Sequence, residues 1–236
     1  MSAPGSHGKP MLISFSGIDG AGKSTQIELL CAHLLNSNFR IKRLAFWDDV
    51  AVLKEYRDTA SHTLFGSERG IGAPGKPVER RDKNVQSWYM TVARFGLYLL
   101  DAISLRVVAA RARREPADVI VFDRYAYDEL ANLSSRNFLV KLYVRFVLAV
   151  VPKPDVAYIL DADPEHARER KPEYPVDFLQ VCRSSYLSLS RTAGLTVIAP
   201  GPVEEVADRI LREFKKASTG SDFDLLPSEE LGRSTS

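Results

Sequence analysis

The sequence is poor in the residues that build disulfide scaffolds and histidine metal sites. Only two cysteines, Cys31 and Cys182, and four histidines occur in 236 residues. Both cysteines fall in stretches with the spacing of amphipathic helices, where a small buried thiol is the common role. The histidines are scattered and lack the spacing of metal ligands. We therefore expect two free thiols, and neither a disulfide nor a histidine metal centre.

Long uncharged apolar runs are also missing. The opening ten residues, MSAPGSHGKP, contain no apolar stretch of the kind that a secretory signal requires. The most apolar later stretch, residues 138–151, is shorter than the roughly 20 residues of a membrane span and carries Lys141 and Arg145. We expect a core helix there, no membrane partner and a cytoplasmic protein.

No charge of one sign dominates the chain. Its 32 basic and 30 acidic side chains give a formal net charge of +2, which offers no case for general nucleic-acid binding. The hydrophobic and charged fractions, 45% and 26%, are those of an ordinary globular protein. The length suits one α/β domain or two small ones.

Apolar runs alternate with stretches of helical spacing along the chain. This alternation is typical of parallel βαβ units, so we predict an α/β fold with a five-stranded parallel sheet and helices on both faces. The predicted strands are residues 11–18, 40–47, 118–125, 155–163 and 195–200.

The composition also predicts the limits of the domain. Residues 11–216 form the predicted domain, after a flexible N-terminus at 1–10 and before a polar, disordered tail at 217–236. Residues 66–83 are rich in glycine and proline and are predicted to be a mobile loop. The charged run at 79–83 either touches substrate or is solvated.

The stretch GIDGAGKST, from Gly17 to Thr25, matches the pattern G-x-x-x-x-G-K-[ST] in full. Glycines let several backbone N–H groups point at one anion, and the following helix adds its positive end. A lysine reaches the outer phosphates and a serine hydroxyl ligates Mg²⁺. We therefore predict a P-loop NTPase fold with ATP and Mg²⁺ as cofactors. The predicted ATP-binding residues are Gly17, Gly20, Gly22, Lys23, Ser24 and Thr25.

A second group of polar residues ends the predicted strand VIVFDRY. Ligands of open parallel sheets bind at the carboxyl ends of the strands, so Asp123 and Arg124 are expected near the glycine-rich loop. An acid in this position holds Mg²⁺, which places Asp123 with Ser24 in the predicted metal site. The planar fork of Arg124 suits a phosphoryl group. A plain ion pair at a strand end is the alternative.

A third, basic group follows the strand at 155–163. Arg168 and Arg170 lie on a short predicted helix within residues 164–175, which we call the closing segment. A mobile basic segment that closes over ATP would stabilise charge on the transferring phosphoryl. The alternative is a solvated helix face.

These three groups, in this order and spacing, resemble the thymidylate kinase family of nucleoside monophosphate kinases. The resemblance covers roughly residues 12–216. It is strongest in ISFSGIDGAGKSTQIELLCAHL, VIVFDRY and YILDADPEHARER. It implies a five-stranded parallel sheet, ATP and a monophosphate meeting at the strand ends, a small-molecule phosphate acceptor as partner, and a possible homodimer formed through long helices.

The resemblance also implies roles for single residues. Asp19 would lie near the sugar or phosphate of the acceptor, Arg124 would meet the acceptor phosphate, and Arg94 would help to bind the monophosphate. Lys23 would hold the ATP phosphates, and the arginines of the closing segment would act on the transferring group. The implied catalytic residues are Lys23, Asp19, Arg124, Arg168 and Arg170.

The chain departs from the family pattern around the acceptor. An Arg-Glu-Pro-Gly stretch is replaced by FWDDVAVLKEY, a base-reading glutamine is missing near Gly96, and the serine- and tyrosine-bearing run after DRY is replaced by AYDELANL. We predict that Trp47 and Asp48 contact the acceptor, with Asp19, Arg94 and Arg124. The aromatic side chains either form a flat slot for a ring or pack in the core. They are Trp47, Trp88, Tyr89 and Phe95.

The functional hypothesis is phosphoryl transfer from ATP·Mg²⁺ to a nucleoside monophosphate, with dTMP as the first candidate. One alternative is a related kinase for a deoxynucleoside, a sugar or another metabolite. The lesser alternative is a P-loop NTPase that acts as a switch.

Overall fold

A five-stranded sheet organises the computed structural model, which describes residues 9–52, 88–133 and 137–219. The strand order is β2-β3-β1-β4-β5, and every neighbouring pair is parallel. All residues of β1 and β4 are buried, as expected for strands covered on both faces. The fold class predicted from the sequence is confirmed. The strands are β1 (Met11–Ser16), β2 (Ile41–Ala45), β3 (Val119–Asp123), β4 (Val156–Leu160) and β5 (Thr196–Ile198).

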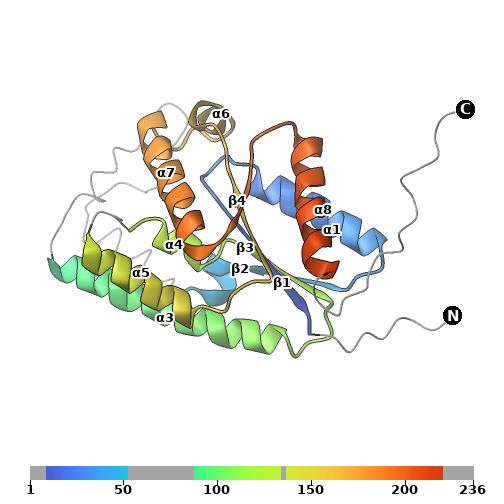
Figure 1. The fold of residues 1–236 in the computed structure, drawn as a ribbon, viewed down its shortest axis with the longest axis horizontal. Coiled ribbons are helices and arrows are strands. Elements are labelled where there is room, and N and C mark those ends of the chain that lie inside the picture. Colours follow the sequence, from blue (N-terminus) through green and yellow to red (C-terminus); the bar gives the residue numbers. More distant parts are fainter. Residues whose placement is uncertain (1–8, 53–87, 134–136, 220–236) are drawn as a thin grey trace, which may run out of the picture.

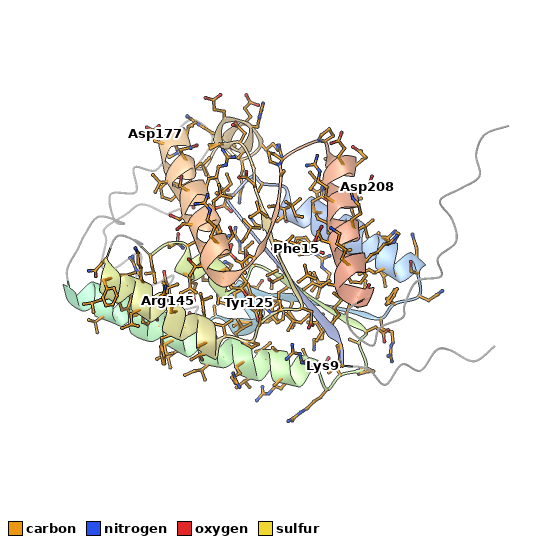
Figure 2. The ribbon with its side chains drawn as sticks, viewed as in Figure 1. Lys9, Phe15, Tyr125, Arg145, Asp177 and Asp208 are labelled. Atoms are coloured by element: carbon orange, nitrogen blue, oxygen red, sulfur yellow. The ribbon has the colours of Figure 1, made fainter. Side chains whose placement is uncertain are left out.

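Helices cover both faces of this sheet (Figure 1). One layer packs α1 and α8 against Ile13 and Phe15, and the other packs α3, α4 and α7 against Leu12 and Phe122. Figure 2 shows Phe15 on the side of α8 and Tyr125 on the side of α5. The helices are α1 (Lys23–Asn36), α3 (Trp88–Ala112), α4 (Ala126–Leu130), α5 (Phe138–Val150), α6 (Pro164–Arg170), α7 (Val176–Ala193) and α8 (Val203–Thr219).

The central place of β1 brings distant loops together. β1 pairs with β3 on one side and β4 on the other, with Phe15 opposite both Asp123 and Tyr158. The loops that follow these three strands therefore leave the same edge of the sheet side by side. Chains that turn to opposite sides at such a point leave a crevice between them, which is where open α/β sheets bind ligands.

The second strand is shorter than the predicted 40–47. It ends at Ala45 and continues as one turn of π-helix, η1 (Phe46–Val50). The carboxylate of Asp49 accepts a hydrogen bond from Ala45 N at 2.7 Å, and Ala51 N donates to Phe46 O at 2.9 Å. These hydrogen bonds give the backbone N–H groups at both ends of the tight turn an acceptor. The extended conformation of the strand therefore ends here. Single π turns are frequent at functional sites.

The expectation of a core helix at 138–151 is wrong in one respect. The segment is helical over Phe138–Val150, but the only buried residues within 138–151 are Val147 and, directly after the helix, Val151. α5 packs on α3 along one edge, where the rings of Phe95 and Tyr143 stack at 4.2 Å, and it presents its other apolar side outward. The exposed large apolar residues are Phe138, Leu139, Leu142 and Phe146 on α5, with Val92, Leu100, Ile103 and Val107 on α3. We call this set the α3/α5 face.

Several predicted boundaries lie at the limits of what the structure describes. α8 extends to Thr219, so the predicted start of the tail at 217 is three residues early. Residues 1–8, the predicted loop at 66–83 and residues 220–236 lie outside the described residues. Within 9–52, 88–133 and 137–219, no helix has both the length and the apolar composition needed to cross a membrane.

Candidate active site

The glycine-rich loop after β1 is held in a shape that only glycine adopts easily. Gly17, Gly20 and Gly22 all have positive φ, at 144°, 82° and 83°. A Cβ on Gly17 would lie 2.6 Å from Leu160 O. A Cβ on Gly20 would lie 2.2 Å from the backbone oxygen of Ala167, because α6 packs directly on the loop. The glycines therefore allow both the turn and the contact with α6.

Helix α1 begins directly after this loop. Gly22 is its N-cap, and its first turn contains no acidic residue, so its free N–H groups and its positive dipole end point out of the helix uncompensated. Ser24 and Thr25 are exposed in this first turn. The arrangement is the anion-binding geometry expected of a phosphate cradle.

Lys23 is buried at the base of the cradle. Its ammonium donates hydrogen bonds to Gly17 O at 2.9 Å and Ile18 O at 2.8 Å. Burial, together with the charge of Arg124, lowers the pKa of Lys23 to about 8, although the nearby carboxylates, Asp128 foremost, act in the opposite direction. The lysine therefore carries its charge at neutral pH but loses it more easily than a solvated lysine.

Arg124 stands beside the cradle in an unusual backbone conformation. Its φ is 67°, a region that residues with a side chain adopt rarely, and its N–H donates to Phe15 O at 2.9 Å. Its guanidinium donates to Asp19 Oδ1 at 2.5 Å and to Asp128 Oδ1 at 3.4 Å. Asp123, at the end of β3, is half-buried. The structure thus brings the P-loop and the end of β3 together, as the sequence predicted.

The ion pair between Arg124 and Asp19 keeps both of these groups charged. Burial opposes the charged form of Arg124, but Asp128 and Asp19 outweigh it and raise its pKa. Burial likewise opposes ionisation of Asp19, but Arg124 and Lys23 outweigh it and lower its pKa. The site is therefore a set of fixed charges at neutral pH.

A cavity of about 360 Å³ opens beside Arg124. The P-loop residues Gly17–Asp19 and three aromatic residues of the α6–α7 region line it. Tyr174 and Phe178 lie with ring centroids 5.1 Å apart. A lining that combines charged groups with flat rings suits a ligand with a phosphate and a ring.

Trp47 also lines this cavity, as do Asp19 and Arg124, whereas the predicted acceptor residues Asp48 and Arg94 do not. Trp47 stands on the η1 turn with its ring edge-on to Phe46 and 38% of its surface exposed. Asp48 is exposed on the same turn, and Arg94 is half-exposed on α3; neither lines the cavity. Phe95 packs against α5 instead of entering a slot. The side chains of Trp88 and Tyr89 lie outside the described residues.

The basic closing segment lies over the phosphate cradle. Asp163 caps α6 by accepting a hydrogen bond from Glu165 N at 3.0 Å, and Arg170 Nη1 donates to Gly20 O at 3.4 Å. Arg168 is exposed on the same helix. Two hydrogen bonds from Arg183 to Asp161, at 2.6 and 2.7 Å, tie α7 to the end of β4. Arg170 is thus close to the loop that would hold ATP.

Sequence reasoning missed Asp128 and Tyr186. Asp128 was part of AYDELANL, which was treated only as a departure from the family. Both side chains line the cavity, and Tyr186 OH donates to Asp128 Oδ1 at 2.9 Å. The available signal was an acid four residues after Arg124, the spacing at which helical side chains meet. Cys182, expected to be fully buried, is half-buried in the cavity wall.

A glycine cradle with a buried lysine, an acid at the next strand end and an arginine beside a ligand-sized cavity define a P-loop phosphotransferase. Comparison with curated proteins carries this further. The chain is 28% identical over 211 residues to a probable thymidylate kinase of Archaeoglobus fulgidus. The aligned region covers 85% of this chain and 92% of that protein. Over most of its length the chain is thus similar to thymidylate kinases, and it is a kinase.

Other relatives come from both archaea and bacteria. A probable thymidylate kinase of Methanosphaera stadtmanae is 25% identical over 86% of this chain and 95% of its own length. A thymidylate kinase of Bifidobacterium longum is 25% identical over 76% of this chain and 84% of its own length. No family model matches the chain.

Substitution of Gly20 by alanine tests the contact between cradle and α6. The added Cβ would meet Ala167 O at 2.2 Å, so α6 must move away from the loop. We expect the affinity for ATP, measured by calorimetry, to fall at least tenfold. Gly96→Ala is the control, because its Cβ meets nothing within 4 Å in a helix, and alanine there should add up to about 1 kcal/mol of stability. Unchanged ATP affinity in Gly20→Ala would contradict the role of this contact.

A pH titration tests the charge of Lys23. A lysine is charged below its pKa, and burial lowers the pKa of Lys23 to about 8. ATP affinity should therefore be constant up to neutral pH and decline as the pH rises above about 8. The dissociation constant is measured from pH 6.5 to 9.5 at fixed ionic strength. Lys23→Arg keeps its charge over this range and should lack the decline; an equal decline in both proteins would show that another group titrates.

Proposed function

We propose that this kinase transfers the γ-phosphoryl group of ATP to dTMP in a Mg²⁺-dependent reaction, giving ADP and dTDP. The observation that carries the proposal is the position of Arg124, which lies between the phosphate cradle and a cavity lined by aromatic rings. A monophosphate in this cavity would place its phosphate at Arg124, next to the γ-phosphate of a nucleotide in the cradle. The names of the curated relatives support dTMP as the acceptor.

The cradle supplies the groups that an ATP phosphate chain needs. The backbone of Gly17–Gly22, the N-terminus of α1 and Lys23 present N–H donors and positive charge. Lys23 at present donates to two loop carbonyls, so it would exchange these bonds for phosphate oxygens. Arg170 approaches the same loop from α6 and would add a second cation.

Ser24 and Asp123 are the residues that we propose for Mg²⁺. Among the described residues no cluster of three or more acidic, histidine or cysteine side chains forms a metal cage. This donor set fits Mg²⁺, which usually binds one or two protein oxygens together with substrate phosphates and water. The charge of Asp123 acts to raise the pKa of Lys23, and this supports a role for the carboxylate at the cradle. The bound ion would neutralise charge on the β- and γ-phosphates.

The acceptor would lie along the cavity. We propose that Arg124 binds its phosphate and that Asp19 and the rings of Tyr174 and Phe178 contact the nucleoside. Trp47 would close the cavity from the η1 side. Arg94, on α3 outside the described lining, is proposed to bind the monophosphate only on the strength of the resemblance.

The protein has little bond-making chemistry to perform in this reaction. It aligns the acceptor phosphate with the γ-phosphoryl, neutralises charge and excludes water. Lys23 and Arg124 are already in place for the first two tasks. Arg168, Arg170 and the rest of the closing segment would stabilise the transferring group and keep water out. An acceptor without a phosphate would leave Arg124 without its partner, and the relatives' names do not favour it.

An assay of ATP consumption against an acceptor panel tests the proposal. The panel holds dTMP, the other nucleoside monophosphates, nucleosides and simple sugars, with Mg²⁺ and a control without acceptor. We expect turnover with dTMP, lowered by two or more orders of magnitude in Lys23→Ala and in Arg124→Ala. Arg212→Ala removes an exposed arginine on α8 and should match the wild type. Turnover confined to another acceptor, or hydrolysis that no acceptor increases, would refute dTMP kinase activity.

The α3/α5 face supports a second proposal, that two copies of the chain pair in solution. The two helices lie side by side along one side of the molecule (Figure 1) and expose a continuous set of large apolar side chains. Such faces mark interaction surfaces in proteins of this size. A second copy is the proposed occupant because the family resemblance implies a homodimer.

Light scattering after gel filtration tests the pairing. The wild type should have twice the chain mass of 26.3 kDa, and Leu142→Glu, which puts a charge into the α3/α5 face, should have the mass of one chain. The control is Leu35→Glu on α1, because Leu35 is 58% exposed and Leu142 is 55% exposed. A monomeric wild type would refute the homodimer.

A further inference from the structure

One buried carboxylate, Asp128, binds Arg124 through Nη1, whereas Asp19 of the P-loop binds Nη2. Asp128 stands in the first turn of α4 with 2% of its surface exposed. A carboxylate this deep in the protein is expensive unless hydrogen bonds and opposite charge compensate it. Its partners therefore indicate what it does.

Both oxygens of Asp128 are fully engaged. Oδ2 accepts hydrogen bonds from Ser16 Oγ at 2.6 Å and from Tyr125 N at 3.0 Å. Oδ1 accepts from Tyr186 OH at 2.9 Å and from Arg124 Nη1 at 3.4 Å. These donors come from β1, from both residues before α4 and from α7, so the carboxylate is fixed from several directions.

Asp128 holds both the backbone next to Arg124 and the guanidinium of its side chain. The positive φ of Arg124 is an unfavourable conformation that its surroundings must impose. On one side Arg124 N is bound to Phe15 O, and on the other the next N–H, that of Tyr125, is bound to Asp128. The same carboxylate then binds the guanidinium. The backbone bond and the side-chain bond together determine where the fork of Arg124 lies.

The two acids at Arg124 are not equivalent. Asp19 belongs to the P-loop and is 25% exposed in its side chain, whereas the side chain of Asp128 is 3% exposed. An arriving phosphate can compete with Asp19 for Nη2, because Asp19 is the more exposed of the two acids. Nη1 would remain on Asp128, which keeps the fork in place during the exchange.

We propose that Asp128 is a positioning residue that fixes the guanidinium of Arg124 for the acceptor phosphate, with Tyr186 as its support from α7. The inference rests on the proposed function, since it names what prepares the acceptor-phosphate contact. Asp128 acts through Arg124 and not on the reacting atoms. Because Tyr186 belongs to the helix that follows the closing segment, the hydrogen bond also links that region to Arg124.

A double-mutant cycle separates positioning from a general structural role. In Asp128→Asn the amide oxygen of the new side chain can still accept hydrogen bonds from Ser16 and Tyr125. Its NH₂ group then faces Nη1 of Arg124, and because both groups are donors, the hydrogen bond to Arg124 is lost. At saturating ATP we expect KM for dTMP to rise about tenfold, with KM for ATP within twofold of the wild type. In an Arg124→Ala background the same substitution should change kcat/KM less than twofold, because the residue through which it acts is gone.

Two further variants protect the test against simple misfolding. Tyr186→Phe keeps the carboxylate of Asp128 and the aromatic ring at position 186, and it removes only the hydrogen bond between them. We expect KM for dTMP to rise about threefold, and only in the protein that retains Arg124. Asp155→Asn removes an acid at the start of β4, the opposite end of the sheet, where it accepts from Leu12 N, and should leave both KM values unchanged. Melting temperatures of all variants report the structural cost.

The possible outcomes separate this inference from the proposed function. The positioning role would be overturned if Asp128→Asn and Tyr186→Phe kept the wild-type KM for dTMP. It would also be overturned if each substitution lowered kcat/KM equally with and without Arg124. Either result would leave the dTMP kinase activity standing. If Asp128→Asn does not fold, the Tyr186→Phe cycle decides alone. A wild type that neither binds nor phosphorylates dTMP would overturn the proposed function and this inference with it.

Discussion

The position of β1 between β3 and β4 is the constraint on which the site depends. Because the three strands are parallel and in register, the P-loop, the Asp123–Arg124 corner and the end of β4 leave the sheet at one edge. Each of these segments then contacts the next through its backbone. Gly17 lies against Leu160, Arg124 N binds Phe15 O, and Gly20 lies against Ala167. The functional side chains thus stand on a frame that side-chain motion alone does not disturb.

Charge in this frame is arranged in advance. Lys23, Arg124, Asp19 and Asp128 lie within one partly buried region, where fixed charges interact more strongly than in water. Both cations have partners in the structure, loop carbonyls for Lys23 and Asp19 for Arg124. Asp128 is almost fully buried and accepts four hydrogen bonds. In the proposed function, substrate phosphates would replace the carbonyls and Asp19, while Asp128 would stay in place.

The sequence predicted the parts of the site that lie on continuous motifs. The loop before α1, the strand β3 and the helix α6 all occur where they are predicted, because glycine spacing, an apolar run and a proline in the first turn of a helix are local signals. The acceptor side was predicted less well. The turn at Phe46–Val50 depends on a bond from Asp49 back to Ala45, and the partners of Asp128 come from β1 and α7, far away in the chain.

The same reasoning explains the error at α5. Apolar content alone predicted burial for residues 138–151, but content does not say how many faces of a helix find a neighbour. In the structure, α3 covers the sheet beneath α5, and only one edge of α5 meets it. Phe95, which the sequence offered as a wall for a base, is used in this helix–helix contact instead.

The contact between Gly20 and Ala167 has a consequence for how the P-loop and the basic helix can vary. α6 rests directly on the loop backbone, with a Cβ on Gly20 only 2.2 Å from Ala167 O and Arg170 bound to Gly20 O. No side chain lies between the two segments to absorb a change in either. The shape of the loop and the position of Arg170 are therefore set together, and a substitution that shifts one must shift the other.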